Sequence, residues 1–164
     1  MDPDALDTPA TRAARAAGIP FRVVVTEPAR DAEESARFQG IELGRLLRTI
    51  VVRRGEDDYV FVLVPGGRRF DWPKLRAHLG VSRLSLPDQQ EAEAVTGYPR
   101  GAITPFGSAR PWPVVADATI VGQGEVAIGG GRRGLTLHLA PADLVAATRA
   151  DVADVTVEEA ADRT

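Results

Sequence analysis

The sequence predicts one α/β domain of the α+β type, in which a mixed, largely antiparallel sheet is flanked by peripheral helices. Three observations carry this prediction. The 164 residues have the size of one domain, and 44% of them are hydrophobic, which allows a sizeable core. Short β-branched runs are interleaved with short helical patterns, and some of the runs are joined as hairpins instead of by regular crossovers. No linker or internal repeat divides the chain.

Capping and turn residues place the elements of the first half. Thr8 caps a helix that begins at Pro9, and Asp31 with Glu34 forms a D-x-x-E capping pattern. The polar stretch 55–58 separates two β-branched runs and is typical of a hairpin. The predicted elements are a helix over 9–17, a strand over 21–26, a helix over 32–39, a turn of helix over 42–46, and strands over 48–53 and 59–64.

Similar signals divide the second half. Asp71 and Asp88 cap two helices that each end before a glycine, and Pro141 opens the last helix. The predicted elements are a helix over 72–79, a strand over 83–86, a helix over 89–96, strands over 113–115, 125–128 and 134–139, a helix over 142–148 and an edge strand over 152–155. We expect residues 156–164 to form an acidic, loose tail.

Composition excludes several classes of protein. The chain has no cysteine, so disulfides and thiolate chemistry are excluded. The acidic start, residues 1–4, lacks the apolar run of a secretory signal, and no stretch approaches the roughly 18 apolar residues of a membrane span. We therefore expect a cytoplasmic protein that does not enter a membrane.

The charge is unevenly distributed. The net charge is −3, but residues 37–83 carry ten Lys and Arg against five Asp and Glu. A basic segment inside an acidic chain fits a footprint for a polyanion, and it equally fits an ordinary solvated surface. Lys74 is the only lysine beside nineteen arginines, a bias typical of genome composition.

The stretch Gly101–Gly107, which reads G-A-I-T-P-F-G, is the most irregular in the chain. Glycine permits positive φ and close approach, and proline fixes φ and removes a donor. Such a loop can present its backbone N–H and C=O groups to a ligand, or it can be a buried turn. Spacing alone leaves both interpretations open.

Side-chain chemistry is scarce. The two histidines, His78 and His138, have no cysteine or carboxylate at ligand spacing, so we predict no metal site and no cofactor. Ser108 has no histidine nearby in the sequence to activate it, and no G-x-S-x-G elbow occurs. The glycines 129–131 lack the lysine and the strand–loop–helix order of a phosphate-binding loop.

Three blocks together resemble the YbaK family and the related editing domain of bacterial prolyl-tRNA synthetases. They are residues 47–52 (L-R-T-I-V-V), the stretch Gly101–Gly107 and residues 129–135 (G-G-G-R-R-G-L). The resemblance extends from about Ala13 to Val155. It implies a compact fold with a curved, barrel-like sheet, an editing domain over 1–155, and aminoacyl-tRNA deacylase activity.

The resemblance also implies a site. Arg48 stands where the family usually has the lysine of a K-T-[LIV] pattern, and with Gly101 it is the expected catalytic pair. The expected substrate-binding residues are Ala102, Ile103, Thr104, Pro105, Phe106, Gly129, Gly130, Gly131 and Arg133. Cysteinyl-specific relatives tend to have a hydroxyl residue at the position of Gly129 and an acid at that of Thr136, and this chain departs from both. In this mode of catalysis the protein orients the ester while a water or a group of the substrate attacks.

The expected function is trans-acting editing of a tRNA mischarged with a small amino acid such as Cys, Ala or Ser, with tRNA-Pro as the candidate tRNA. The alternatives are a non-catalytic tRNA- or nucleotide-binding module of the same fold and a hydrolase of a small ester. The expected partners are the aminoacyl-tRNA acceptor end and, as a candidate, a prolyl-tRNA synthetase, with the chain as a monomer or homodimer.

Overall fold

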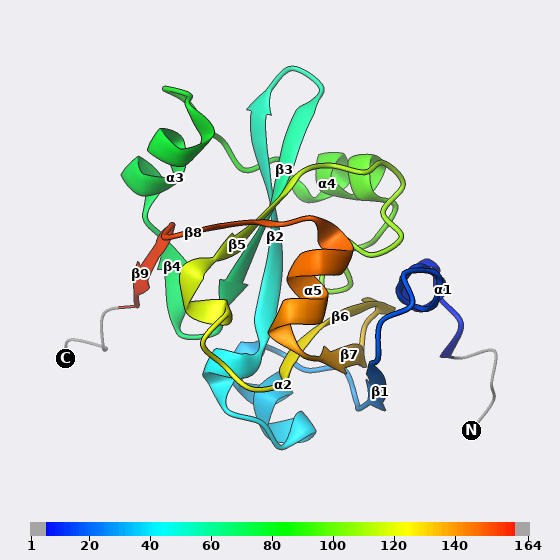
Figure 1. The fold of residues 1–164 in the computed structure, drawn as a ribbon. Coiled ribbons are helices and arrows are strands. Elements are labelled where there is room, and N and C mark those ends of the chain that lie inside the picture. Colours follow the sequence, from blue (N-terminus) through cyan, green and yellow to red (C-terminus); the bar gives the residue numbers. More distant parts are fainter. Residues whose placement is uncertain (1–5, 160–164) are drawn as a thin grey trace.

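Five α-helices and three sheets make up residues 6–159, the part of the chain that the computed structural model describes (Figure 1). The helices are α1 (Pro9–Ala16), α2 (Ala32–Gln39), α3 (Trp72–Leu79), α4 (Gln89–Thr96) and α5 (Pro141–Thr148), with single 3-10 turns η2 (Leu43–Arg45) and η3 (Ala118–Ile120). The strands are β1 (Arg22–Val25), β2 (Leu47–Gly55), β3 (Asp58–Pro65), β4 (Arg68–Phe70), β5 (Val114–Asp117), β6 (Val126–Arg132), β7 (Leu135–Leu139), β8 (Asp151–Ala153) and β9 (Thr156–Glu158).

The strands form sheets of order β2-β3-β5-β8, β1-β7-β6 and β4-β9. The pairs β3-β5 and β5-β8 are parallel and the other four pairs are antiparallel, so the prediction of a mixed, largely antiparallel arrangement is confirmed. The expected single barrel-like sheet is not found in residues 6–159. Among these residues, backbone pairing between the first two sheets is limited to an isolated bridge between Leu46 and Ala127, although their inner faces pack together in the core.

The helix ends follow from capping chemistry. Three aspartates, each before a helix, accept a hydrogen bond from the backbone N–H three residues on, at 2.8, 3.1 and 2.8 Å, and they are Asp31, Asp71 and Asp88. Each of these helices ends at a left-handed glycine, which leaves the last carbonyls satisfied. The predicted helices over 32–39, 72–79 and 89–96 are confirmed.

The core lies on both faces of the β2-β3-β5-β8 sheet. Side chains alternate along β3, so Phe61 and Leu63 face the β1-β7-β6 sheet, while Val60 and Val62 face α3 at Leu75. These side chains are at most 1% exposed, and each contributes about 1.5–3 kcal/mol by burial. Because β3 is anchored on both faces, its neighbour β2 is held firmly and can carry a site on its free edge.

Two predicted elements differ from the structure. Residues 83–86 are not a strand; the segment touches the edge of β2 at one bridge, between Ser85 and Arg53. The glycines 129–131, which lie between the predicted strands 125–128 and 134–139, belong to β6 instead of to the connection, and the chain turns at Arg133–Gly134. A register shift between Gly129 and Arg132 absorbs the extra residues.

The expected loose tail is also corrected in part. Thr156–Glu158 forms β9, which pairs with β4, a three-residue strand that the sequence analysis did not predict. Arg68 Nε donates to Thr156 Oγ1 at 2.7 Å, which fixes this pair. Residues 160–164 of the predicted tail lie outside the described residues.

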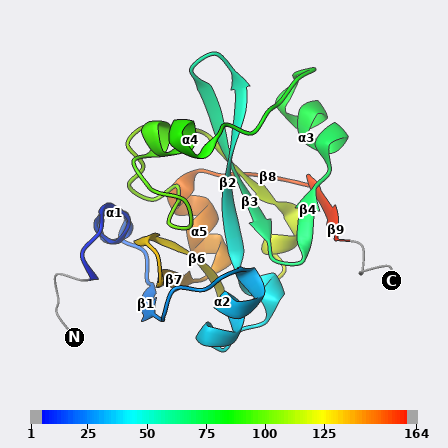
Figure 2. The same cartoon turned by 180° about the vertical axis from the view of Figure 1, so that it is seen from behind.

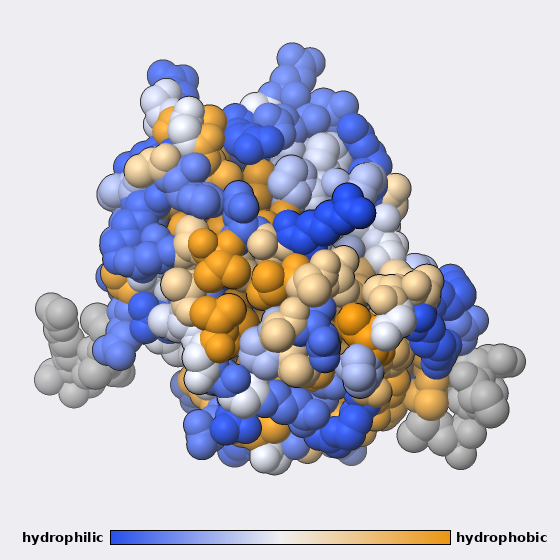
Figure 3. Space-filling model, in the orientation of Figure 1, coloured by the Kyte–Doolittle hydropathy of each residue, from blue (hydrophilic) through white to orange (hydrophobic). Residues whose placement is uncertain are grey.

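Views from opposite sides show two different faces. Figure 2 turns β2 and α2 towards the viewer, with the loop that follows α4 beside them. Figure 3 shows apolar surface at the centre of the opposite face, beside α5, where Figure 1 places β8 and the turn that follows β5. Within residues 6–159, no helix combines the length and apolar character needed to cross a bilayer.

Candidate functional site

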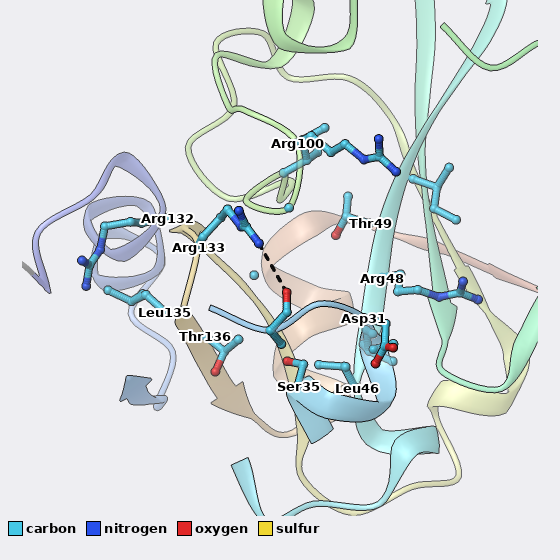
Figure 4. A pocket seen from close by; sticks show the side chains of 18 of the residues that line it. Asp31, Ser35, Leu46, Arg48, Thr49, Arg100, Arg132, Arg133, Leu135 and Thr136 are labelled. Carbon is cyan, nitrogen blue, oxygen red and sulfur yellow. Dashed lines mark hydrogen bonds between the residues drawn. The ribbon is translucent and has the colours of Figure 1, made fainter. Parts of the chain in front are cut away.

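A cleft of about 940 Å³ runs along the free edge of β2 and is walled by α2, the loop after α4 and the β6–β7 hairpin (Figure 4). All three sequence blocks contribute lining residues. The predicted site residues among them are Arg48, Gly101, Ile103, Gly129 and Arg133. The volume suits a small organic group with room for a neighbouring nucleotide.

The two glycine blocks meet at the backbone. A Cβ at Gly129 would stand 3.1 Å from the carbonyl oxygen of Ile103, closer than an ordinary contact. Gly101 has φ +87°, and a Cβ there would lie 3.4 Å from Nε of Arg133. Residue 129 is thus small because the loop backbone lies against it, and residue 101 is glycine because of its left-handed conformation.

Much of the central loop faces the core instead of the cleft. Ala102, Thr104 and Phe106 are at most 4% exposed, and the Tyr98 hydroxyl donates to the Phe106 carbonyl at 2.6 Å. Pro105 does not line the cleft either. That these four loop residues bind substrate stays a prediction. In the fold, the buried side chains among them anchor the loop, and Gly101 and Ile103 line the cleft.

Gly130 and Gly131 also lie outside the cleft. A Cβ on Gly130 would be 2.0 Å from Cδ2 of Leu135, inside the hairpin. Gly131 packs against α1, where a Cβ would be 3.2 Å from Thr8. Of the three consecutive glycines, Gly129 lines the cleft and the other two do not.

Arg48 and Thr49 point to opposite sides of β2 (Figure 4). The guanidinium of Arg48 donates to the Arg68 carbonyl and lies 3.9 Å from Oε1 of Glu159, away from Thr49. The Thr49 hydroxyl is buried and has no partner among the described residues. Nε of Arg48 is likewise buried and unpaired among the described residues, and both residues line the cleft. The sequence analysis had used Thr49 only as part of a pattern.

The free edge of β2 adds main-chain groups. Arg53 exchanges two backbone hydrogen bonds with Ser85, at 2.8 and 3.1 Å, across this edge. Because main-chain groups of an antiparallel strand alternate in direction, those of Thr49 and Val51 point to the same edge. Both residues line the cleft. The cleft therefore offers backbone donors and acceptors next to the Thr49 hydroxyl.

A polar cluster that the sequence analysis did not predict forms the floor. Gln39 Oε1 lies 2.9 Å from the Thr136 hydroxyl and 2.7 Å from His138 Nε2, and Gln39 Nε2 donates to Ser35 Oγ at 2.8 Å. His138 is 2% exposed, and burial, followed by the nearby charge of Arg22, lowers its pKa. The alternation along 134–139 was a signal that Thr136 and His138 share one face, but nothing local pointed to Gln39.

Exposed arginines border the cleft. Arg100 and Arg133 stand at one rim, and Arg133 Nη2 donates to the Ala29 carbonyl at 3.3 Å (Figure 4). Asp31 also lines the cleft, with one carboxylate oxygen occupied by the cap of α2. No group of His, Cys, Asp and Glu in residues 6–159 is arranged to hold a metal ion. The arrangement suits an anionic ligand bound largely by backbone and hydroxyl groups.

A second cavity, of about 610 Å³, lies further along β2. Four arginines line it, namely Arg53, Arg54, Arg76 and Arg83. Arg54 is paired with Asp58 at 3.0 Å, and Arg53 lies 3.7 Å from Glu91, so part of this charge is neutralised. The segment 82–87 borders both cavities, so they form one continuous surface.

Comparisons with known proteins show the family to which the chain belongs. Residues 26–147 match the profile of the aminoacyl-tRNA editing domain. The chain is 29% identical over 128 residues to EbsC of Enterococcus faecalis, a candidate Cys-tRNA(Pro)/Cys-tRNA(Cys) deacylase, covering 78% of each protein. It is 28% identical over 130 residues to ProXp-y of Escherichia coli K12, a multifunctional Ser/Thr-tRNA deacylase, covering 77% of this chain and 78% of ProXp-y. A solved structure described as a candidate trans-editing enzyme for prolyl tRNA synthetase superposes with a TM-score of 0.84 at 30% identity, over 97% of this chain and 99% of that one.

Proposed function

Because the chain belongs to the aminoacyl-tRNA editing domain family, we propose that it acts in trans to hydrolyse the ester of a tRNA mischarged with a small amino acid. The resemblance to this family in the sequence is confirmed by the match over residues 26–147. The names of the relatives favour cysteine or serine as the amino acid and tRNA-Pro as a substrate.

One observation carries the proposal. The start of β2, the loop at Gly101 and the glycine at 129 face a single cleft, although they are far apart in the sequence. The loop and β6 approach so closely that a side chain at 129 would press on the Ile103 carbonyl. Such a backbone-lined slot suits the ester and the terminal adenosine of a tRNA, because an activated ester needs orientation more than a strong nucleophile.

In this proposal each part of the cleft has its own role in binding or orienting the substrate. Main-chain N–H groups of the central loop hold the carbonyl oxygen of the ester, and the Thr49 hydroxyl orients the attacking water. Arg100 and Arg133 bind phosphate at the rim. Arg48 contributes charge from the far side of β2 and ties that strand to β4 through the Arg68 carbonyl. No titrating side chain is required in this scheme, because the positioned donors stabilise charge that develops on the carbonyl oxygen.

The second cavity extends the RNA contact. A single strand bound along β2 would pass from Thr49 towards Arg53, a run of four residues or about 13 Å at roughly 3.3 Å per residue. Arg76 and Arg83 line this cavity without an acidic partner among the described residues, so they are placed to meet backbone phosphates. Arg68, by contrast, bonds to Thr156 and lies 3.9 Å from Asp117, which gives it a structural role.

Single-turnover deacylation of tRNA-Pro carrying Cys, Ala or Ser tests the proposal. We expect at least one ester to be hydrolysed well above its spontaneous rate. Thr49→Val keeps the shape but removes the hydroxyl, and a lost neutral hydrogen bond corresponds to about a two- to tenfold slower reaction. In the same assay, Arg48→Lys should retain more activity than Arg48→Ala, because it keeps the charge.

The matched control is Thr148→Val, which makes the same change in α5, where the hydroxyl bonds only to the Leu144 carbonyl. It should leave the rate unchanged. If every ester survives excess protein, the chain does not deacylate these substrates, and the non-catalytic binding module becomes the better description. The observation that favours that second candidate is that the guanidinium of Arg48 is already engaged by the Arg68 carbonyl and lies near Glu159.

A further inference from the structure

The polar floor of the cleft has a defined hydrogen-bond polarity. The guanidinium of Arg22 can only donate, and its Nη2 lies 3.3 Å from Nδ1 of His138, so Nδ1 accepts and the imidazole proton sits on Nε2. Nε2 then donates to Gln39 Oε1 at 2.7 Å. The lowered pKa of His138, caused first by burial, keeps the ring neutral and preserves this pattern. Glu125, 3.6 Å from Nδ1, is held by Arg22 at 2.6 Å.

The orientation of the Gln39 amide follows. Its oxygen must face His138 and Thr136, and its NH₂ must face Ser35, to which it donates at 2.8 Å. Ser35 Oγ accepts this bond and keeps its own O–H free. Thr136 donates towards Gln39 and keeps acceptor capacity on its oxygen. The cleft floor therefore presents one donor, the Ser35 hydroxyl, and one acceptor, the Thr136 oxygen, with the Gln39 amide between them.

This pair lies beside the place where the ester would bind. Thr136 is the cross-strand partner of Gly129 in the β6–β7 ladder, so their Cα atoms are about 4.5–5.5 Å apart. Gly129 in turn lies against the Ile103 carbonyl. The side chain of an amino acid whose carbonyl rests on the central loop would reach Thr136, whereas the adenosine, on the other side of the ester, would not.

We propose that Ser35, Gln39 and Thr136 select aminoacyl esters with a hydroxyl side chain, and that His138 is a positioning residue for Gln39. This inference rests on the proposed deacylase function and names its substrate class. A serine or threonine hydroxyl can accept from Ser35 and donate to Thr136 at once. An alanine methyl would leave both groups unpaired in a partly dry site, and a thiol is a weaker partner on both counts. A site built to hydrogen-bond a hydroxyl discriminates strongly against analogues that lack it.

Single-turnover deacylation of one tRNA carrying Ser, Ala or Cys, by the wild type and four variants, tests this. We expect the wild type to hydrolyse the seryl ester at least about tenfold faster than the alanyl ester. Thr136→Val is nearly isosteric and should slow the seryl reaction about tenfold while the alanyl rate stays within about twofold. His138→Leu should also slow the seryl reaction more than the alanyl reaction. His138→Gln can still donate to Gln39 and should keep the preference for the seryl ester. Thr148→Val is the control and should alter neither rate.

The outcomes are separable. Hydrolysis of alanyl or cysteinyl ester as fast as seryl ester, or an equal loss on all esters in Thr136→Val, overturns the selectivity and leaves the deacylase function standing. No hydrolysis of any ester overturns both. Thermal melts accompany the assay, and if His138→Leu does not fold, the ratio of seryl to alanyl rates in Thr136→Val decides. A His138→Gln variant that loses the preference as fully as His138→Leu refutes the positioning role.

Discussion

Adding a single methyl group at Gly129 tests whether the close approach of two backbones is needed for activity. The new Cβ would stand 3.1 Å from the Ile103 carbonyl, about 0.3 Å short of the 3.4 Å at which ordinary contact begins. The φ of residue 129 is not in the left-handed region, so alanine fits the local backbone. The strain therefore falls on the central loop, which must move by a few tenths of an ångström.

This displacement sets the magnitude. A misplacement of about 1 Å can cost roughly 100-fold in rate, so a shift of about 0.3 Å corresponds to a loss of about three- to tenfold. Stability should change little, because two effects oppose each other. Overpacking destabilises the folded state by about 1–3 kcal/mol, while replacing glycine restricts the unfolded chain and stabilises the fold by about 0.5–1 kcal/mol. We expect Gly129→Ala to slow single-turnover deacylation and to lower Tm by no more than about 5 °C.

Two neighbouring glycines serve as controls. Gly130→Ala would place its Cβ 2.0 Å from Leu135 Cδ2 and 2.9 Å from the Leu135 carbonyl, so it should lower Tm more than Gly129→Ala does. Gly122 has open space around it, and Gly122→Ala should alter neither quantity. A Gly129→Ala protein with full activity would refute the reasoning. A Gly129→Ala protein that loses activity but also has a Tm as low as that of Gly130→Ala would refute it too.

Two further predictions concern acid and salt. The pKa of His138 is lowered in the folded state from its usual 6.5, so the unfolded chain takes up the proton first as the pH falls. The contribution of His138 to stability should therefore be constant above about pH 6.5 and decrease as the pH drops below it. Melts between pH 8 and 5.5 measure this slope, which His138→Gln should abolish; an unchanged slope in the variant would assign it to another group. If the second cavity meets RNA phosphates, tRNA binding should weaken with salt, and Arg83→Glu should reduce both the affinity and the salt slope, whereas Arg15→Glu on α1 should not. An affinity for tRNA that is indifferent to salt would exclude this contact.

Local chemistry explains why so much of the fold was predictable. The aspartate before α2 and the glycine after it, Asp31 and Gly40, determine that helix from neighbouring residues alone. β4 was not predictable, because its three residues carry no apolar alternation and pair only through β9, which is about 88 residues away. Its existence is a tertiary effect, not a local propensity.

The site, like the fold, could be predicted from the sequence only in part. The three blocks that line the cleft were recognisable as blocks, but the side of the strand on which a residue lies was not. Arg48 and Thr49 are adjacent, and only the tertiary packing of β2 decides that the arginine reaches the Arg68 carbonyl of β4 while the threonine points to the other side of the strand. The inward alternation of Ala102, Thr104 and Phe106 was a readable signal that those residues belong to the core. Gln39 and His138 are 99 residues apart, so no spacing rule could join them.

The pairing of β1 with β7 has a consequence for synthesis. Val24 and Thr136 are partners in this ladder and are 112 residues apart. During synthesis β1 therefore cannot pair until β7 has been translated. The cleft takes residues from both ends of that interval, because it is lined from Thr26 to Thr136. A nascent chain can form α1, α2 and the β2–β3 hairpin early, since those contacts are local, but long-range pairing is slow and comes late. We expect that no ester can be bound by the incomplete chain, and that activity begins only when the last third of the protein has emerged and closed the ladder.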